Sequence, residues 1–381
     1  MLQRLFTIIN FDKVVQAYLV ITPIIWLPAI QQNNIQFMLF NYGAMILLAL
    51  ALSLPIKRQT DNALPFVSLL LIAVISIWAN ITGFSIGFLH VTSAIALYYA
   101  ILLGVKDYKS VIRAILLMAA INIVIATLQK SGFYIIYFKE IYSEADIPGA
   151  FSQSFFNCHV SMPGLMGRNY LLSYMLIFVT PLAFLINKLF GIVLYIITTI
   201  FAMLIGSYAC ILSLVVMTAY LASKYIKWRV LAIIGIIALS TICFIKKDLV
   251  VYKINTRVES YRYIVNESLV NPFRGKGLGT FDFNVNIESA DRKFESSYNQ
   301  YLRIPYEISW AAFIAIIYMF FSYLLKLKSS RYFTASFIAM AVYPMFHEVL
   351  RFARLDILFI AILAANEIQC LERRQKNEVN S

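Results

Sequence analysis

The chain has 381 residues, of which 61% are hydrophobic and only 13% are charged, and its mean hydropathy is +0.77. Soluble domains are nearer to half apolar and a quarter charged, so this composition excludes an ordinary soluble protein. The formal net charge is +13 at pH 7. Because the basic residues are dispersed among apolar stretches, positive-inside topology and anionic phosphate ligands explain them better than nucleic acid does. We therefore expect no nucleic-acid partner.

Apolar stretches recur along the whole chain, and about 20 such residues are enough for a helix to cross a bilayer. The pattern predicts an all-α polytopic membrane protein, a single integral membrane domain over residues 1–381, with about 12 transmembrane helices. A transmembrane barrel would show short alternating segments instead. The first stretch contains Pro23 and Pro28 and is of full length, which predicts a retained span rather than a cleavable signal peptide. The predicted spans are residues 14–30, 35–55, 64–80, 84–105, 111–128, 169–186, 189–205, 208–223, 229–245, 309–325, 332–347 and 354–369.

The distribution of Lys and Arg predicts the orientation of these spans. With the N-terminus in the cytoplasm, the three short outer loops contain no Lys or Arg, whereas the short inner loops do. Long loops cross the membrane largely regardless of their charge. We therefore predict that both termini are cytoplasmic, that residues 370–381 form a cytoplasmic tail, and that residues 129–168 and 246–308 are extracytoplasmic. The short outer loops lie near residues 31–34, 81–83 and 206–207.

The second long outer segment, residues 246–308 between the ninth and tenth spans, is a polar island with ten Lys or Arg and eight Asp or Glu. Residues 255–270 within it predict an amphipathic helix that Asn271 and Pro272 end. Gly275, Gly277 and Gly279 follow at alternate positions and permit tight turns and close backbone approach to a ligand. The residue order of a P-loop, GxxxxGK[ST], does not occur in this glycine-rich segment. The apolar positions of the predicted helix are Val258, Tyr261, Ile264, Val265 and Leu269.

Three phrases of the polar island together resemble the O-antigen ligase and polymerase superfamily of polytopic bacterial inner-membrane glycosyltransferases. They are Arg257 with the aromatic Tyr261, the segment NPFRGKGLGTF that begins at Asn271, and SSYNQYLRIPYEIS that begins at Ser296. The resemblance covers roughly residues 255–310, and a weaker similarity occurs at Arg168. The first five spans match the superfamily only in hydropathy. The order of the features carries the resemblance, because each one alone is common.

One departure separates the two branches of that superfamily. Ligases typically carry a His before the Asn of the third phrase, and this chain has Tyr298 before Asn299. The difference favours the polymerase branch and leaves the general base unassigned. The resemblance implies an enzyme of the bacterial inner membrane whose active face is periplasmic.

The chemistry that the resemblance implies is transfer of a glycan from a polyprenyl pyrophosphate to a hydroxyl of another lipid-linked repeat unit. The leaving pyrophosphate needs fixed cations, and the acceptor hydroxyl benefits from a positioned base. The donor bond is already activated, so we expect no cofactor and no metal. Arginine suits the pyrophosphate because its planar fork pairs with phosphate oxygens.

The candidate site residues follow from these needs. His347 and Glu348, in the turn after the eleventh span, are the candidate catalytic bases, and Tyr298 and Asn299 mark the motif. The alternative is that the cations are solvated charges or partners of nearby Glu residues. The turn after the eleventh span would then be only an interfacial cap. The candidate pyrophosphate-binding residues are Arg168, Arg257, Arg262, Arg274, Lys276, Arg351 and Arg354.

Three functions stay open at the level of the sequence. The first is an O-antigen or capsular repeat-unit polymerase, which could work beside a chain-length regulator and a flippase. The second is an O-antigen ligase that joins the glycan to lipid A-core. The third is a flippase or other transporter of lipid-linked oligosaccharides, although transporters favour ionisable groups inside their spans.

Overall fold

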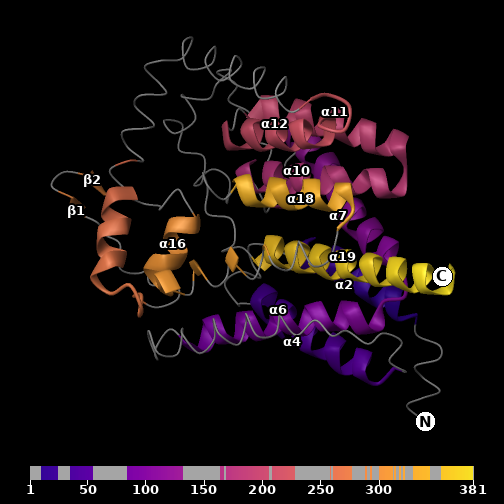
Figure 1. Ribbon diagram of the computed structural model, residues 1–381, viewed down its shortest axis with the longest axis horizontal. Helices are drawn as coiled ribbons and strands as arrows, with labels where there is room; N and C mark the ends of the chain where they lie inside the picture. The colour runs from indigo at the N-terminus through magenta and orange to yellow at the C-terminus, as the bar shows by residue number, and fades with distance from the viewer. Residues whose placement is uncertain are drawn as a thin grey trace.

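The computed structural model describes a helical protein whose helices lie side by side in one bundle (Figure 1). The only strands in the described part of the chain are β1 (Glu288–Ser289) and β2 (Arg292–Lys293), which pair antiparallel. The predicted all-α class is therefore confirmed. The described residues are 10–24, 35–54, 84–131, 164–166, 169–205, 208–227, 258, 261–276, 288–289, 292–293, 300–311, 313–314, 317–318, 321, 329–343 and 353–380.

α10 (Asn169–Ile186) packs against α7 (Tyr108–Lys130), α11 (Lys188–Ile205) and α18 (Arg331–Val342). α19 (Ala353–Asn380) packs against α6 (Phe84–Gly104) and α7. The outer pair α4 and α6 lies beside α19, and α2 lies beside α7. The long helices are α2 (Phe11–Ile24), α4 (Ile35–Leu52), α6 (Phe84–Gly104), α7 (Tyr108–Lys130), α10 (Asn169–Ile186), α11 (Lys188–Ile205), α12 (Tyr208–Ala222), α18 (Arg331–Val342) and α19 (Ala353–Asn380). The shorter elements are η1 (Gly164–Met166), α16 (Gln300–Glu307) and a helix over residues 261–270.

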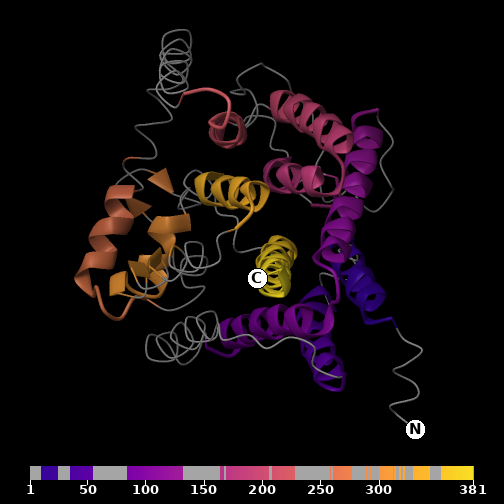
Figure 2. The same cartoon turned by 45° about the vertical axis from the view of Figure 1, so that its right-hand side comes forward.

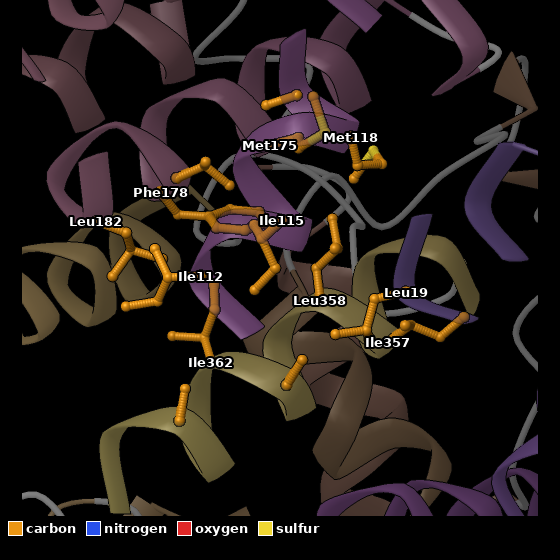
Figure 3. Close-up of a cluster of buried hydrophobic side chains, with 14 of the residues drawn as sticks. Leu19, Ile112, Ile115, Met118, Met175, Phe178, Leu182, Ile357, Leu358 and Ile362 are labelled. Carbon is orange, nitrogen blue, oxygen red and sulfur yellow. The ribbon is translucent and has the colours of Figure 1, made fainter. Parts of the chain in front are cut away.

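Apolar side chains from several helices fill the middle of the bundle (Figure 3). Phe178 from α10 lies among Ile112 and Ile115 from α7 and Leu358 from α19, and all four are fully buried. Side chains packed this closely gain many small dispersion contacts with one another. Residues far apart in the sequence therefore share one continuous core.

Small polar side chains are also buried between the helices. The Thr180 and Thr198 hydroxyls lie 2.7 Å apart between α10 and α11, and the Ser336 hydroxyl donates to the Phe178 carbonyl at 2.6 Å. The opposite pattern holds on the outside of α11, where large apolar residues at helical spacing are exposed. This stripe consists of Leu189, Ile192, Val193, Ile196, Ile200 and Met203. The helices thus place polar groups inside and a long apolar stripe outside.

Among the described residues, one helix is long and apolar enough to cross a membrane by length and composition, namely α7 with 23 residues. Five further apolar helices have described stretches of 10–17 residues. The coarse prediction of a helical protein is confirmed, and the number of about 12 spans stays a prediction.

The two ends of the bundle gather different parts of the chain. At one end, Asp12 accepts from the Lys106 backbone amide at 3.0 Å, and the Arg331 guanidinium donates to the Tyr220 carbonyl at 2.6 Å. The C-terminal end of α19 lies at this end, and residues 261–276 and α16 lie beyond the opposite end (Figure 1). At that opposite end the Tyr301 hydroxyl donates to the Ala341 carbonyl of α18 at 2.6 Å.

Candidate functional site

The described part of the polar island is the helix over residues 261–270, the turn 271–276 and α16, which lie together at one end of the molecule (Figure 2). The predicted amphipathic helix is confirmed over 261–270, and Asn271 ends it as expected. Ile264 is fully buried and packs with Tyr306 in a small apolar cluster. Val258 and Leu269 are exposed instead of buried, because α16 has only eight residues and covers one face of the helix.

The turn after this helix brings the backbone into close contact with the end of α16. Gly275 has a φ of +65°, and its amide donates to the Asn271 carbonyl at 3.2 Å. A Cβ atom placed on Gly275 would lie 2.6 Å from the carbonyl oxygens of both Glu307 and Ile308. The predicted need for glycine is confirmed here. The close approach is to the chain's own backbone, and Gly277 and Gly279 lie outside the described residues.

Hydrogen bonds join two phrases that are separated by about 30 residues in the sequence, a spacing that no local turn can bridge. The Lys276 amide donates to the Tyr306 carbonyl at 2.8 Å, and the Trp310 amide donates to the Pro272 carbonyl at 2.9 Å. The Trp310 indole N–H donates to the Ser268 hydroxyl at 3.0 Å. The segment that begins NPFRGK and the segment that ends LRIPYEISW therefore fold as one unit.

A buried ion pair that the sequence analysis missed lies inside this unit. Arg303 and Glu307 are only 4% and 6% exposed. The Arg303 Nε and Nη2 atoms donate to Glu307 Oε1 at 3.0 and 2.8 Å. A buried charge requires a partner, and here the i,i+4 spacing on α16 supplies it. That spacing was the available signal, but the burial depends on the helix that packs across from it.

The cations of the turn fall into two groups. Lys276 forms an ion pair with Glu267 at 3.0 Å, so for this residue the alternative of an ordinary pair is confirmed. Arg262 and Arg274 are exposed and form no ion pair with any described residue. Arg274 therefore presents an exposed guanidinium on the turn, and Arg262 presents another near the start of the preceding helix.

The other predicted site residues lie in other segments of the chain. Arg354 lies in the first turn of α19, where only the backbone is described. Convergence of residues 129–168, residues 246–308 and the segment after α18 on one site therefore stays a prediction. The predicted site residues outside the described part of the chain are Arg168, Arg257, Tyr298, Asn299, His347, Glu348 and Arg351.

Among the described residues of the bundle, a buried glutamate lies between α19 and α6. The Glu367 carboxylate of α19 is 1% exposed and accepts a hydrogen bond from the Tyr98 hydroxyl of α6. The sequence analysis placed charges at the ends of the spans and did not single out Glu367. Its bond to Tyr98 joins α19 to α6. No group of three His, Cys, Asp or Glu residues that could hold a metal occurs among the described residues.

The tyrosines of the site are hydrogen-bond donors at neutral pH. Burial raises the pKa of Tyr306 to about 12, and Tyr263, Glu267 and Glu307 act in the same direction. Burial likewise raises the pKa of Tyr301 to about 12. These phenols keep their protons, so neither can act as the general base.

The raised pKa of Tyr306 predicts a loss of stability in alkali. Between pH 10, where the unfolded phenol ionises, and pH about 12, the folded state binds one proton more than the unfolded state. The free energy of unfolding therefore falls as the pH rises through this interval. Tyr306→Phe should make that fall shallower, as measured by denaturation followed by tryptophan fluorescence. Equal slopes for the wild type and the variant would contradict the assignment.

No protein-family model matches the chain, and no curated protein matches it. The residues of the polar island and their geometry are therefore the evidence for the function.

Proposed function

We propose that the protein is a membrane glycosyltransferase, an O-antigen or capsular repeat-unit polymerase that uses a polyprenyl-pyrophosphate-linked glycan. The observation that carries this proposal is the contact between the two phrases of the polar island. The turn at Pro272 to Lys276 and the segment from Tyr306 to Trp310 are hydrogen-bonded to each other, as parts of one site should be. Arg274 lies within that turn and Arg262 in the helix before it, and both side chains are exposed.

In the proposed reaction, an acceptor hydroxyl oxygen attacks the anomeric carbon of the donor sugar. The bond from that carbon to the pyrophosphate oxygen breaks, and the lipid pyrophosphate leaves with the bonding electrons. The proton of the hydroxyl passes to a base, for which His347 or Glu348 is the candidate. Arg262 and Arg274, with Lys276 nearby, would stabilise the negative charge that develops on the leaving group. No cofactor is needed for this balance.

The distribution of polar and apolar residues in the bundle supports a membrane location. Without a hydrophobic driving force between helices in lipid, their contacts favour small and polar residues. Thr180, Thr198 and Ser336 provide such contacts between α10, α11 and α18. The exposed apolar stripe on α11 would be costly in water and is stable against lipid tails.

The contacts at the two ends of the bundle support the proposed orientation. Asp12, Lys106 and Arg331 belong to segments expected in the cytoplasm, and all are bonded at the end where α19 finishes. The helix over residues 261–270, the turn after it and α16 lie at the other end, as parts of an extracytoplasmic loop should. The active face would then be periplasmic.

Deletion of the gene tests the proposed function directly. The surface polysaccharide, separated on a gel, should lose its ladder and keep a band of core plus one repeat unit. Loss of all attached glycan would point to the ligase or the flippase instead, and an unchanged ladder would refute all three functions. Glu367 inside the bundle is an ionisable group of the kind that transporters use, and its hydrogen bond to Tyr98 favours a packing role.

Complementation of the deletion with variants tests the cations. The double variant Arg262→Ala with Arg274→Ala should weaken the ladder by about 10-fold or more at an unchanged protein level. The reason is that two positive charges that stabilise the leaving pyrophosphate are removed. Arg373→Ala is the matched control, since this exposed arginine lies at the opposite end, on α19. A full ladder from the double variant would remove both arginines from the site.

A further inference from the structure

One face of the polar island is apolar and exposed although the rest of the unit is well packed. Leu269, Val270 and Phe273 are 55%, 65% and 71% exposed. Arg262 and Arg274, which form no ion pair with a described residue, are exposed on the same helix and turn. We call these five residues the turn face. Large apolar side chains flanked by free cations are typical of segments that lie on an anionic membrane surface.

The hydrogen bonds of Trp310 fix the height of the turn face relative to the predicted tenth span. Trp310 follows the first residue of that span, residues 309–325, and tryptophan is enriched where a membrane meets water. Its amide donates to the Pro272 carbonyl at 2.9 Å, and its indole N–H donates to the Ser268 hydroxyl at 3.0 Å. Phe273 and Leu269 are the immediate sequence neighbours of those two partners. They therefore lie at the level where the bilayer should begin.

The residues that follow Trp310 along the predicted span also expose apolar side chains. Ile314, Tyr318 and Phe321 follow at helical spacing and are all exposed. In addition, the helix over residues 261–270 runs across the direction of α18 and α19 in both views (Figures 1 and 2). A helix that crosses the bundle axis at the edge of the spans lies parallel to the membrane plane.

We propose that the turn face rests on the outer leaflet of an anionic phospholipid bilayer. Leu269, Val270 and Phe273 enter the boundary between headgroups and acyl chains, and Arg262 and Arg274 lie at the level of the phosphates. This inference rests on the membrane location in the proposed function and deepens it. The pyrophosphate of a lipid-linked donor lies at the same level, so the contact with the bilayer brings the two arginines to the height of the leaving group.

Quenching by brominated lipids tests this contact without reference to activity. Phe273→Trp places a reporter at an exposed position, and the emission of the four native tryptophans is subtracted with the wild type. The full chain is placed in nanodiscs of phosphatidylglycerol and phosphatidylcholine, with or without bromine on the acyl chains. Asn377→Trp is the control, because Asn377 is exposed at the far end of α19.

The expected result is that Phe273→Trp loses most of its added emission in brominated discs while Asn377→Trp keeps its own. If the native tryptophans are quenched and the added emission at 273 is not, the docking proposal fails and the membrane location stands. A blue-shifted but unquenched reporter at 273 would mean that protein, such as a second copy of the chain, covers the face, and this too overturns the proposal. If the native tryptophans also escape quenching, the membrane location fails, and with it the proposed function.

Discussion

Glu307→Ala should lower the free energy of unfolding by about 3–5 kcal/mol, the usual cost of removing one partner from a buried ion pair. The Arg303 guanidinium would stay at a site where it is only 4% exposed, without the carboxylate that now accepts two of its N–H groups. Since α16 also holds the turn through the Tyr306 carbonyl, the loss should loosen the whole described part of the polar island. Denaturation of the purified protein in mixed micelles, followed by tryptophan fluorescence, measures the change.

Two comparisons separate burial from charge in this prediction. The double variant Arg303→Met with Glu307→Leu should recover most of the stability, because well-packed apolar residues can replace a buried pair at little cost. Glu267→Ala breaks the exposed pair with Lys276 and should cost no more than about 1 kcal/mol. Similar small losses for Glu307→Ala and Glu267→Ala would show that the Arg303 site admits water.

Gly275→Ala should abolish the polysaccharide ladder. Its φ of +65° costs a residue with a side chain about 1–2 kcal/mol. The new Cβ atom would also lie 2.6 Å from the carbonyl oxygens of Glu307 and Ile308, which are backbone atoms and cannot rotate away. The turn must therefore separate from α16, and Arg274 and Lys276 move with it. Complementation of the deletion strain measures the ladder, and immunoblotting of membranes measures the amount of protein.

Gly275→Asn distinguishes the two causes of this defect. Asparagine adopts a positive φ more readily than alanine does, but it carries the same Cβ atom. If the contact with α16 is what matters, Gly275→Asn should be as defective as Gly275→Ala. A ladder restored by asparagine alone would assign the defect to backbone strain and would count against the close packing of the turn on α16.

The sequence predicts much of the local structure and few of the contacts between elements that are distant in the chain. Asn271 and Pro272 end a helix for reasons that are local to the chain, and the need for glycine at 275 is local too. The burial of Arg303 and Glu307 depends instead on a helix about 30 residues earlier that packs across α16, and such contacts leave no local signal. The exposure of Leu269 has the same origin, because a helical period shows which residues share a face and not how much of that face a partner covers.

Gln129 and Asn122 illustrate the same limit in the bundle. Their side chains bond the backbone of η1, with Gln129 Oε1 accepting from the Gly164 amide and Asn122 Oδ1 from the Leu165 amide, both at 2.8 Å. In the sequence Asn122 is a single polar residue in an apolar stretch, and Gln129 stands beside Lys130 where that stretch ends. Their partners lie 35 and 43 residues away. Hydropathy therefore predicts the helix but not the role of its polar positions.

The bond from the Tyr301 hydroxyl to the Ala341 carbonyl has a consequence for how the enzyme would work. Ala341 is near the end of α18, six residues before His347, the candidate base. α16 is bonded to the arginine-bearing turn through the Tyr306 carbonyl and to α18 through the Tyr301 hydroxyl. A donor that shifts the turn when it binds would also shift the end of α18, because α16 is bonded to both. Binding of the donor and the position of α18 would then be coupled.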